Sequence, residues 1–481
     1  MRLPLVVSHA ASGRTVTMER AGDAVLRHWL LLAVLAPAVM LRMMAWFAIQ
    51  PAWWILGDAI AYLQDAIHLH PDNWRPSGYS LLVLRPLLPM HSLSLVTGVQ
   101  HVMGIGVGVL VYATSLRLGL PRWVAVLTAI PVLFDGYVIA TEQMLASESL
   151  FATLIVVALV LLLWPAGRPA HLLVAAAGLL LALAALTRTV GLPLIAVTAL
   201  FLLLPRPAWS RLLVICVAFA LPIWVYALWF SQTYGQVNLT LSSGIFMYGE
   251  ATQFVDCSKV RFSDDQLRRL CPTQPVGARN EVWYIFDANS PLRKTGLGGA
   301  AYNELAGRFA VEAIRAQPAA YAAVAWDGIV KSFAWDQRTL FNDMLFNGDH
   351  SLPDQARAAG MAYQGKDPTP IIRPSLVRVL AVYQSNAHVR GTVCLLTLIV
   401  AAAALLFGRD SEERRLRGAL LLTAGVATVL LMVPAMTTIV APRYRIPAIP
   451  EVCLAGAIGG TMLFNRWRSF GVAATRGHLS T

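Results

Sequence analysis

Residues 171–204, HLLVAAAGLLLALAALTRTVGLPLIAVTALFLLL, decide the fold class of this chain. They form two apolar runs, about 171–186 and 190–204, and Arg188 lies between them. A helix needs roughly 20 mostly apolar residues to cross a bilayer, so the stretch predicts two short membrane spans joined by almost no loop. Arg188 then lies at a membrane boundary, where an ionisable group is costly and tends to mark chemistry or ligand binding.

The composition extends this prediction to the whole chain. Of its 481 residues, 57% are hydrophobic and 13% are charged, and the mean hydropathy is +0.60. A soluble protein would carry about a quarter charged residues. We therefore predict an all-α polytopic membrane protein with about ten transmembrane helices. The predicted spans are about 29–50, 92–116, 121–140, 149–164, 171–186, 190–204, 211–230, 389–407, 416–437 and 446–464.

Basic residues gather at alternate connections between these spans, and the positive-inside rule makes those connections cytoplasmic. They are the N-terminal tail, Arg117 with Arg122, Arg168, Arg206 with Arg211, the run 408–417, and Arg466 with Arg468. The outer connections are then about 51–91, 141–148, 187–189, 231–388 and 438–445. This pattern accounts for the net charge of +12 and the pI near 9.8. Nucleic acid is not expected as a partner, because the chain has no basic stripe with interleaved aromatic residues.

The topology divides the chain into membrane and non-membrane parts. The parts are a cytoplasmic tail at 1–28, an N-terminal transmembrane module at 29–230 that contains the first outer loop at 51–91, an extracytoplasmic domain at 231–388, C-terminal transmembrane helices at 389–464 and a cytoplasmic tail at 465–481. The tail 1–28 lacks the compact apolar core and cleavage site of a signal peptide. The segment 231–388 is far longer than an ordinary connection, which predicts a sizeable α-rich or mixed domain. If it is extracytoplasmic, Cys257 and Cys271 are expected to form a disulfide.

The first outer loop predicts interfacial helices. In GDAIAYLQDAIHLH, residues 57–70, three apolar side chains share one helical face, while Asp58, Tyr62 and Asp65 lie near another. This spacing is typical of a short amphipathic helix at a membrane surface. RPSGYSLLV, residues 75–83, interrupts that helix, and a second short apolar helix is expected after it.

Asp58 is the main catalytic candidate. A carboxylate there can accept a proton from an incoming hydroxyl or help to bind a divalent cation, and it can equally be a helix-start residue. Asp65 and His68 fit either a binding role or a solvated helix face. A metal site built from Asp58, Glu142 and His68 is possible, but no compact metal signature is present. The cofactor is therefore left open, with a divalent cation as one candidate.

Further candidates flank the later spans. In ATEQMLASESLF, residues 140–151, Glu142 and Glu148 can recognise a substrate hydroxyl or bind a metal, although a helix start also explains Glu148. Arg188, Arg443 and Arg445 lie on the outer side, against the positive-inside bias. An arginine fork suits phosphate oxygens, so these three favour an anionic ligand over a simple membrane anchor.

The order of four short motifs resembles the GT-C superfamily of polytopic glycosyltransferases, and most closely its protein O-mannosyltransferase and aminoarabinose-transferase branch. The motifs are GDAIAYLQDA, RPSGYSLLV, ASESLFATL and APRYRIPAIP. The resemblance implies a transferase that uses a polyprenyl-phosphate sugar, with Asp58 as the catalytic acidic residue and Arg443 on the lipid phosphate. Arg75 and Tyr444 lie in these motifs and are further candidates for substrate binding. Many members of the family pair two acidic residues in the first loop, whereas here Ala59 follows Asp58.

These observations predict a transferase in a bacterial cytoplasmic membrane with its active site on the extracytoplasmic side. It would move a sugar to a hydroxyl of a cell-envelope acceptor, with inversion, since a single displacement needs only one base. A transporter or flippase for a lipid-linked anion is the alternative, but transporters place their sites near the bilayer midplane. A non-catalytic envelope protein is a third class that the composition leaves open.

Overall fold

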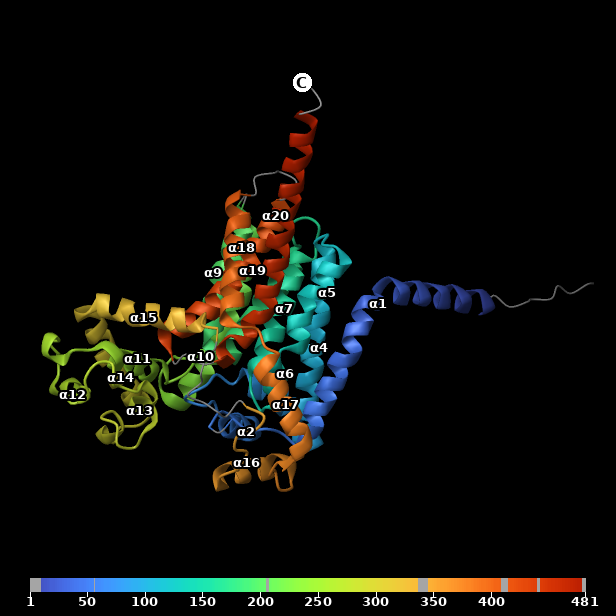
Figure 1. Ribbon diagram of the computed structural model, residues 1–481. Coiled ribbons are helices and arrows are strands. Elements are labelled where there is room, and N and C mark those ends of the chain that lie inside the picture. The colour runs from blue at the N-terminus through green and yellow to red at the C-terminus, as the bar shows by residue number, and fades with distance from the viewer. Residues whose placement is uncertain are drawn as a thin grey trace, which may run out of the picture.

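The computed structural model describes residues 10–55, 57–204, 207–335, 345–407, 414–438 and 442–477. The chain folds into a helical bundle with a smaller helical unit beside one of its ends (Figure 1). The helices of the bundle are α1 (Ala10–Ala48, which belongs to the bundle from Arg27 on), α4 (Leu93–Arg117), α5 (Arg122–Phe134), α6 (Gly136–Gln143), α7 (Glu148–Leu163), α8 (His171–Thr187), α9 (Leu194–Leu203), α10 (Trp209–Tyr234), α18 (Gly391–Phe407), α19 (Arg414–Thr437) and α20 (Ile449–Gly477). Helices α4, α7 to α10 and α18 to α20 contribute to one large hydrophobic cluster, and α1, α5 and α6 pack in smaller clusters.

The structure confirms an all-α multi-pass membrane protein, while the number of ten spans stays a prediction. Among the described residues, five helices are long and apolar enough to cross a membrane, and two helix pairs bent by 49° and 40° raise this to seven. The predicted spans at 149–164, 171–186 and 190–204 form the shorter apolar helices Glu148–Leu163, His171–Thr187 and Thr189–Leu203. Each is below the roughly 20 residues that an untilted span needs.

The first outer loop forms the predicted short helix, α2 (Asp58–His68), and a π-helical turn at Ser80–Leu84 follows it. Asp58, Tyr62 and Asp65 are all buried, so Asp65 does not lie on a solvated helix face. Helix α16 (Asp354–Gln364) and the π-helical turn both pack against α2. The polar side of α2 faces protein as well, because Asp58 accepts from Arg75 and Arg443 and Tyr62 donates to Ser147.

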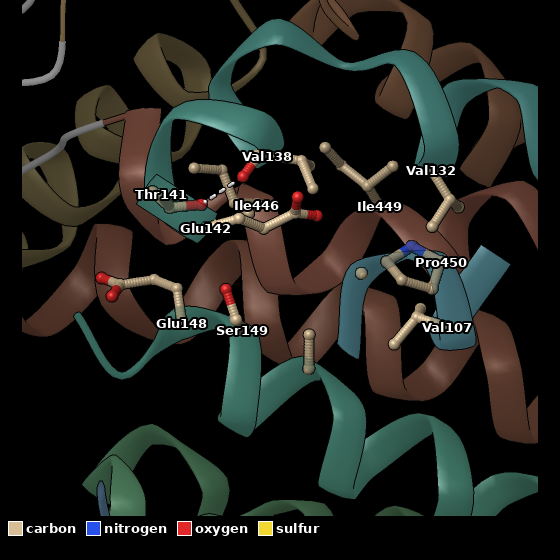
Figure 2. A pocket seen from close by; sticks show the side chains of 12 residues that line it. Val107, Val132, Val138, Thr141, Glu142, Glu148, Ser149, Ile446, Ile449 and Pro450 are labelled. Carbon is tan, nitrogen blue, oxygen red and sulfur yellow. Dashed lines mark hydrogen bonds between the residues drawn. The ribbon is translucent and has the colours of Figure 1, made fainter. Parts of the chain in front are cut away.

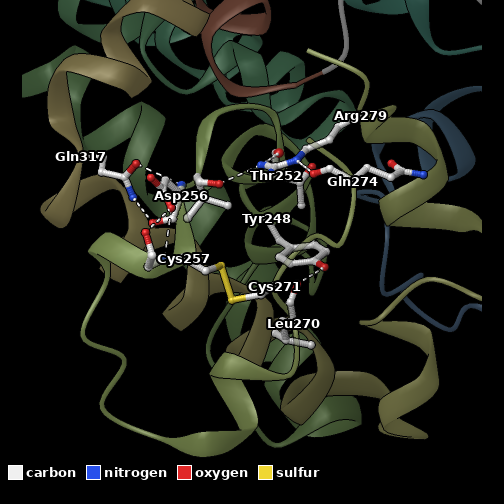
Figure 3. The surroundings of a disulfide bond; sticks show 11 residues. Tyr248, Thr252, Asp256, Cys257, Leu270, Cys271, Gln274, Arg279 and Gln317 are labelled. Carbon is white, nitrogen blue, oxygen red and sulfur yellow. Dashed lines mark hydrogen bonds between the residues drawn. A yellow bond between two sulfur atoms is a disulfide. The ribbon is translucent and has the colours of Figure 1, made fainter. Parts of the chain in front are cut away.

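The segment 231–388 divides into two parts. The first is a compact unit around its own hydrophobic cluster, and we call it the outer unit. It comprises α11 (Ser243–Phe254), α12 (Asp265–Arg268), α13 (Glu281–Phe286), α14 (Gly299–Ala316) and α15 (Pro318–Ser332). A bond between the Cys257 and Cys271 sulfurs closes its 14-residue loop, beside the buried Tyr248 ring (Figure 3).

The second part returns to the bundle. α16 covers α2, and α17 (Pro374–Asn386) packs against α1 and α6. The strand β2 (Ile371–Ile372) pairs antiparallel with β1 (Ile49–Gln50) at the end of α1. Because α17 and α18 form one of the bent pairs, the predicted boundary at 388 falls inside a candidate span.

Candidate active site

Five charged side chains meet at the end of the bundle that carries α2, which we call the site end. Asp58 begins α2, and Glu148 begins α7. Arg188 follows the last residue of α8, and Arg443 lies in the 3-10 turn Pro442–Tyr444. Arg75 lies in the loop between α2 and the π-helical turn. All five are sequence-predicted candidates, and they come from parts of the chain up to 385 positions apart.

Arg443 is the centre of this charged cluster. Its Nη2 donates to Asp58 Oδ2 at 2.6 Å, and its Nε donates to Glu148 Oε1 at 2.8 Å. The other oxygen of Asp58 accepts from Arg75 Nε at 2.7 Å. Glu148 Oε1 also accepts from Arg188 Nη1 at 2.5 Å. The five groups therefore form a continuous chain in the order Arg75, Asp58, Arg443, Glu148, Arg188.

Arg75 and Arg443 are more exposed than the carboxylates Asp58 and Glu148 that hold them. The three guanidinium groups of the cluster face Asp58 and Glu148, and a third carboxylate, Asp72, lies beside Arg75 with its Oδ1 3.9 Å from Arg75 Nη1. Glu148 has a side-chain exposure of 0%, whereas Arg75 has 26% and Arg443 has 17%. The exposed edge of the cluster therefore carries arginine forks, and Asp58 and Glu148 hold these forks in place from the protein side.

Aromatic and hydroxyl groups complete the cluster. The Tyr62 hydroxyl donates to Ser147 Oγ at 3.1 Å, and Arg188 Nη1 also reaches this oxygen, at 3.4 Å. The Tyr444 ring lies 5.3 Å from the Arg188 guanidinium carbon and 5.8 Å from that of Arg443, within cation–π range. Burial raises the pKa of Tyr62 to about 12, so this phenol stays a hydrogen-bond donor.

The protonation state of Asp58 follows from its neighbours. Burial by itself would raise the pKa of Asp58, but the guanidinium groups of Arg443 and Arg75 lie within ion-pair distance and outweigh it. The pKa of Asp58 consequently lies well below its ordinary value. The carboxylate is ionised, as a proton acceptor must be before it acts.

A small, mostly apolar pocket lies behind Glu148, between α4, α6, α7 and α20 (Figure 2). Glu142 and Glu148 both line it, together with Ile446 and Ile449. Within the described part of the chain, Glu148 Oε2 has no hydrogen-bond partner. One oxygen of Glu148 thus holds two arginines while the other is left without a donor, which is unusual for a buried carboxylate.

The loop that carries Arg75 is bound to the outer unit by stacking and hydrogen bonds of the two preceding residues. Trp74 stacks on Phe286 with ring centres 5.8 Å apart, and its carbonyl accepts from Ser242 Oγ at 2.9 Å. The Asn73 carbonyl accepts from Leu241 N at 2.6 Å. On the other side, a Cβ at Gly78 would lie 2.5 Å from the Leu186 carbonyl oxygen. Only glycine allows the loop to pass so close to the end of α8, just before Arg188.

Glu142, a predicted substrate-binding residue, belongs to a different buried network. Arg42 Nη2 donates to its Oε1 at 2.8 Å, and His101 Nδ1 lies 2.8 Å from its Oε2. Gly104 makes room for this carboxylate, since a Cβ there would lie 1.7 Å from Glu142 Oε1. Glu142 therefore lines the pocket but does not join the charged cluster at Arg443.

Arg445 and Asp65 also lie apart from the cluster. The Arg445 side chain is buried and close enough to Asp135 and His388 to interact electrostatically with both. Asp65 is 2% exposed, and neither of its carboxylate oxygens completes a hydrogen bond within the described residues. Burial raises the pKa of Asp65 to about 7, although the nearby Ser77 and Ser80 hydroxyls act in the opposite direction.

The suggested metal ligands are not assembled. His68 is exposed, Glu142 is held by Arg42 and His101, and both oxygens of Asp58 accept from arginines. In the ranges that the structure describes, no three His, Cys, Asp or Glu side chains are grouped as a metal site would require. The donors around Asp58 are cations, which would oppose rather than assist a bound metal ion.

Sequence reasoning did not identify Arg42, His101 and Trp74. Arg42 and His101 are ionisable residues inside predicted spans, and that position alone could have marked them as members of a buried network. Trp74 carried no such signal, because its role depends on an aromatic partner more than 200 positions away.

Comparison with solved structures gave two structural neighbours, both crystal structures of ArnT from Cupriavidus metallidurans. The apo ArnT structure is 13% identical, covers 91% of this chain and 77% of ArnT, and has a TM-score of 0.35. The structure bound to undecaprenyl phosphate is 14% identical, covers 91% and 78%, and also has a TM-score of 0.35. No family model and no curated protein matches the chain. At this low similarity, the function has to be argued from the site itself.

Proposed function

We propose that this protein is a membrane glycosyltransferase that moves a sugar from a polyprenyl-phosphate donor to a hydroxyl group of a cell-envelope acceptor. The observation that carries the proposal is the position of Arg443, which bridges Asp58 and Glu148 at one end of an apolar bundle. A base candidate and phosphate-binding forks thereby lie next to one another. The surrounding apolar helices suit a donor whose aliphatic tail stays in the bilayer.

The donor phosphate would bind on the exposed edge of the charged cluster. Arg75, Arg188 and Arg443 offer fork-shaped donors that suit phosphate oxygens. The donor is a phosphodiester with one negative charge, and one of its oxygens can take the place of a carboxylate oxygen on a shared arginine. The polyprenyl phosphate that leaves is a monoester and can carry a second negative charge. The leaving phosphate is stabilised by the same cations that bind it, so no separate acid is required.

The reaction would be a single displacement with inversion. The acceptor oxygen forms a bond to the anomeric carbon, and its proton passes to a carboxylate oxygen of Asp58. The bond between the anomeric carbon and the phosphate oxygen breaks, and its electron pair leaves on the polyprenyl phosphate. One base and one cationic cluster account for every proton and charge in this step.

The location of the reaction follows from the predicted topology. The cluster lies in connections that the positive-inside rule assigns to the outer side, so we place the active site on the extracytoplasmic face of a bacterial cytoplasmic membrane. The outer unit lies at the same end and is in contact with the loop that carries Arg75. It would contribute to binding of the acceptor.

The test is transfer by purified protein in lipid vesicles that contain a radiolabelled polyprenyl-phosphate sugar and an envelope acceptor fraction. The native protein should form labelled acceptor, and Asp58→Asn should lower the rate by roughly 10²- to 10⁴-fold. Asp327→Asn, an exposed carboxylate outside the cluster, is the matched control. Equal rates for native and Asp58→Asn protein would disprove the role of Asp58, and flux of donor without transfer would favour a transporter.

A further inference from the structure

The helix α15 exposes an apolar side on the outer unit. Trp326 is 66% exposed and Val330 is 52% exposed, one helical turn apart. Ala319, Ala322 and Ala323 are exposed on the same side of the helix. Single exposed apolar residues are normal, but five on one helical face form a continuous apolar surface.

Both ends of α15 are attached to the site end of the bundle. Near its start, the Tyr321 hydroxyl donates to the Met436 carbonyl at 3.2 Å, one residue before α19 ends. Just after its end, the chain packs on the first residue of α18, where a Cβ at Gly391 would lie 2.6 Å from the Ala334 carbonyl oxygen. α15 therefore lies across the ends of two membrane helices, as Figure 1 shows.

The sides of α15 have different surroundings. Tyr321 and Val324 pack on the core of the outer unit, and Ile329 packs on the core of the bundle. Asp327 and Lys331 form an ion pair with an N–O distance of 2.5 Å on a charged edge. At 100° per residue, the face centred on Trp326 points away from the outer unit and lies between the bundle and this charged edge.

Trp335 marks the level of the membrane surface next to this face. Its ring is 62% exposed, and the guanidinium carbon of Arg390, at the start of α18, lies 5.3 Å from the ring centre. Tryptophan with arginine at the end of a span is typical of the interface between lipid headgroups and acyl chains.

From this placement we infer that α15 is an interfacial helix on which the outer unit rests against the bilayer, with Trp326 and Val330 inserted among the lipids. The occupant of the apolar face is thus the bilayer surface beside α18 and α19. Amphipathic helices of this kind bury their apolar side roughly 5–10 Å into the headgroup and acyl boundary. The outer unit would then be held at a set distance from the membrane, whichever reaction the protein catalyses.

The test uses a polarity-sensitive fluorophore on Trp326→Cys and, as the matched control, on Asp327→Cys, one residue along the helix. Both are made with Cys216→Ser, because Cys216 is an exposed free thiol. The full-length protein is reconstituted in phosphatidylcholine and phosphatidylglycerol vesicles, with or without lipid carrying a nitroxide near the top of the acyl chain. Folding of each variant is checked by its elution as a single species in detergent.

The label at 326 should emit at shorter wavelength and be quenched at least about two-fold more by the nitroxide lipid than the label at 327. Equal quenching at the two positions, or none, would overturn the inference. A blue-shifted label at 326 that nitroxide lipid does not quench, together with cross-linking between protein copies, would instead assign the face to a second copy. None of these readouts depends on transferase activity.

Discussion

Arg443 Nη2 donates to Asp58 Oδ2 at 2.6 Å, across 385 positions of the chain. The contact couples the two halves of the proposed chemistry, because the arginine that would hold the phosphate also holds the base. A phosphate that binds Arg443 competes with Asp58 for the same guanidinium. Donor binding would therefore loosen Asp58 at the moment when the base is needed.

Replacing Arg443 tests whether activity requires a single guanidinium group that donates to both Asp58 and Glu148. Arg443→Ala should lower kcat/KM by roughly 10²- to 10³-fold, because phosphate stabilisation is lost and two carboxylates are left facing each other. Arg443→Lys should recover little of this, since a point charge cannot donate in the two directions of Nε and Nη2. Transfer kinetics at varied donor concentration measure both. Arg308→Gln, on the exposed surface of the outer unit, is the control, and a fully active Arg443→Lys would contradict the fork geometry.

Arg75 is expected to set the pH at which Asp58 gains a proton. The pKa of Asp58 is lowered by Arg443 and Arg75 against the effect of burial, so the native enzyme should keep its base well into the acidic range. Removal of one cation in Arg75→Gln leaves the burial effect less opposed and raises that pKa. In a plot of kcat/KM against pH, the acidic limb reports the pKa of the base in the free enzyme, and this limb should move to higher pH. An unchanged limb would show that Arg75 does not act on Asp58.

Asp65 should make stability depend on pH. Its folded-state pKa of about 7 lies above the value of about 3.9 expected for an unfolded chain. The folded state thus binds the proton more tightly, and stability is lost as pH rises from about 4 through about 7. Asp65→Asn cannot ionise, so its melting temperature in detergent should exceed that of the native protein at pH 8 but not at pH 4. The same difference at both pH values would exclude ionisation as the cause.

Trp74 should act as a positioning residue for Arg75. Trp74→Ala removes the stacking on Phe286 and frees the loop that carries Arg75, so transfer should fall roughly 10- to 100-fold, as expected when a polar group is misplaced by about 1 Å. Trp74→Phe should restore most of the activity, and the acidic limb of Trp74→Ala should shift in the same direction as that of Arg75→Gln. Trp283→Ala truncates another partly buried aromatic residue packed on the same core and controls for general destabilisation. If Trp74→Ala and Trp283→Ala lose the same activity and the acidic limb of the pH profile does not shift, Trp74 supports the fold and does not position Arg75.

The sequence by itself determined the membrane class and most of the charged candidates. Long apolar runs can be recognised locally, since a span needs only enough apolar residues in a row. Charged residues at the ends of such runs are rare enough to be noticed one by one. Asp58, Arg188 and Arg443 were found in this way, and so was the short helix that begins at Asp58.

Only the tertiary structure decided which of these charges meet. Glu142 and Glu148 lie six positions apart, yet one is held by Arg42 and His101 and the other by Arg188 and Arg443. Arg443 and Arg445 likewise differ by two positions, but only Arg443 reaches Asp58. Local spacing cannot decide such cases, because a side chain takes the direction that its turn and its long-range neighbours impose. An ion pair costs desolvation wherever it forms, and only packed helices supply partners that offset this cost.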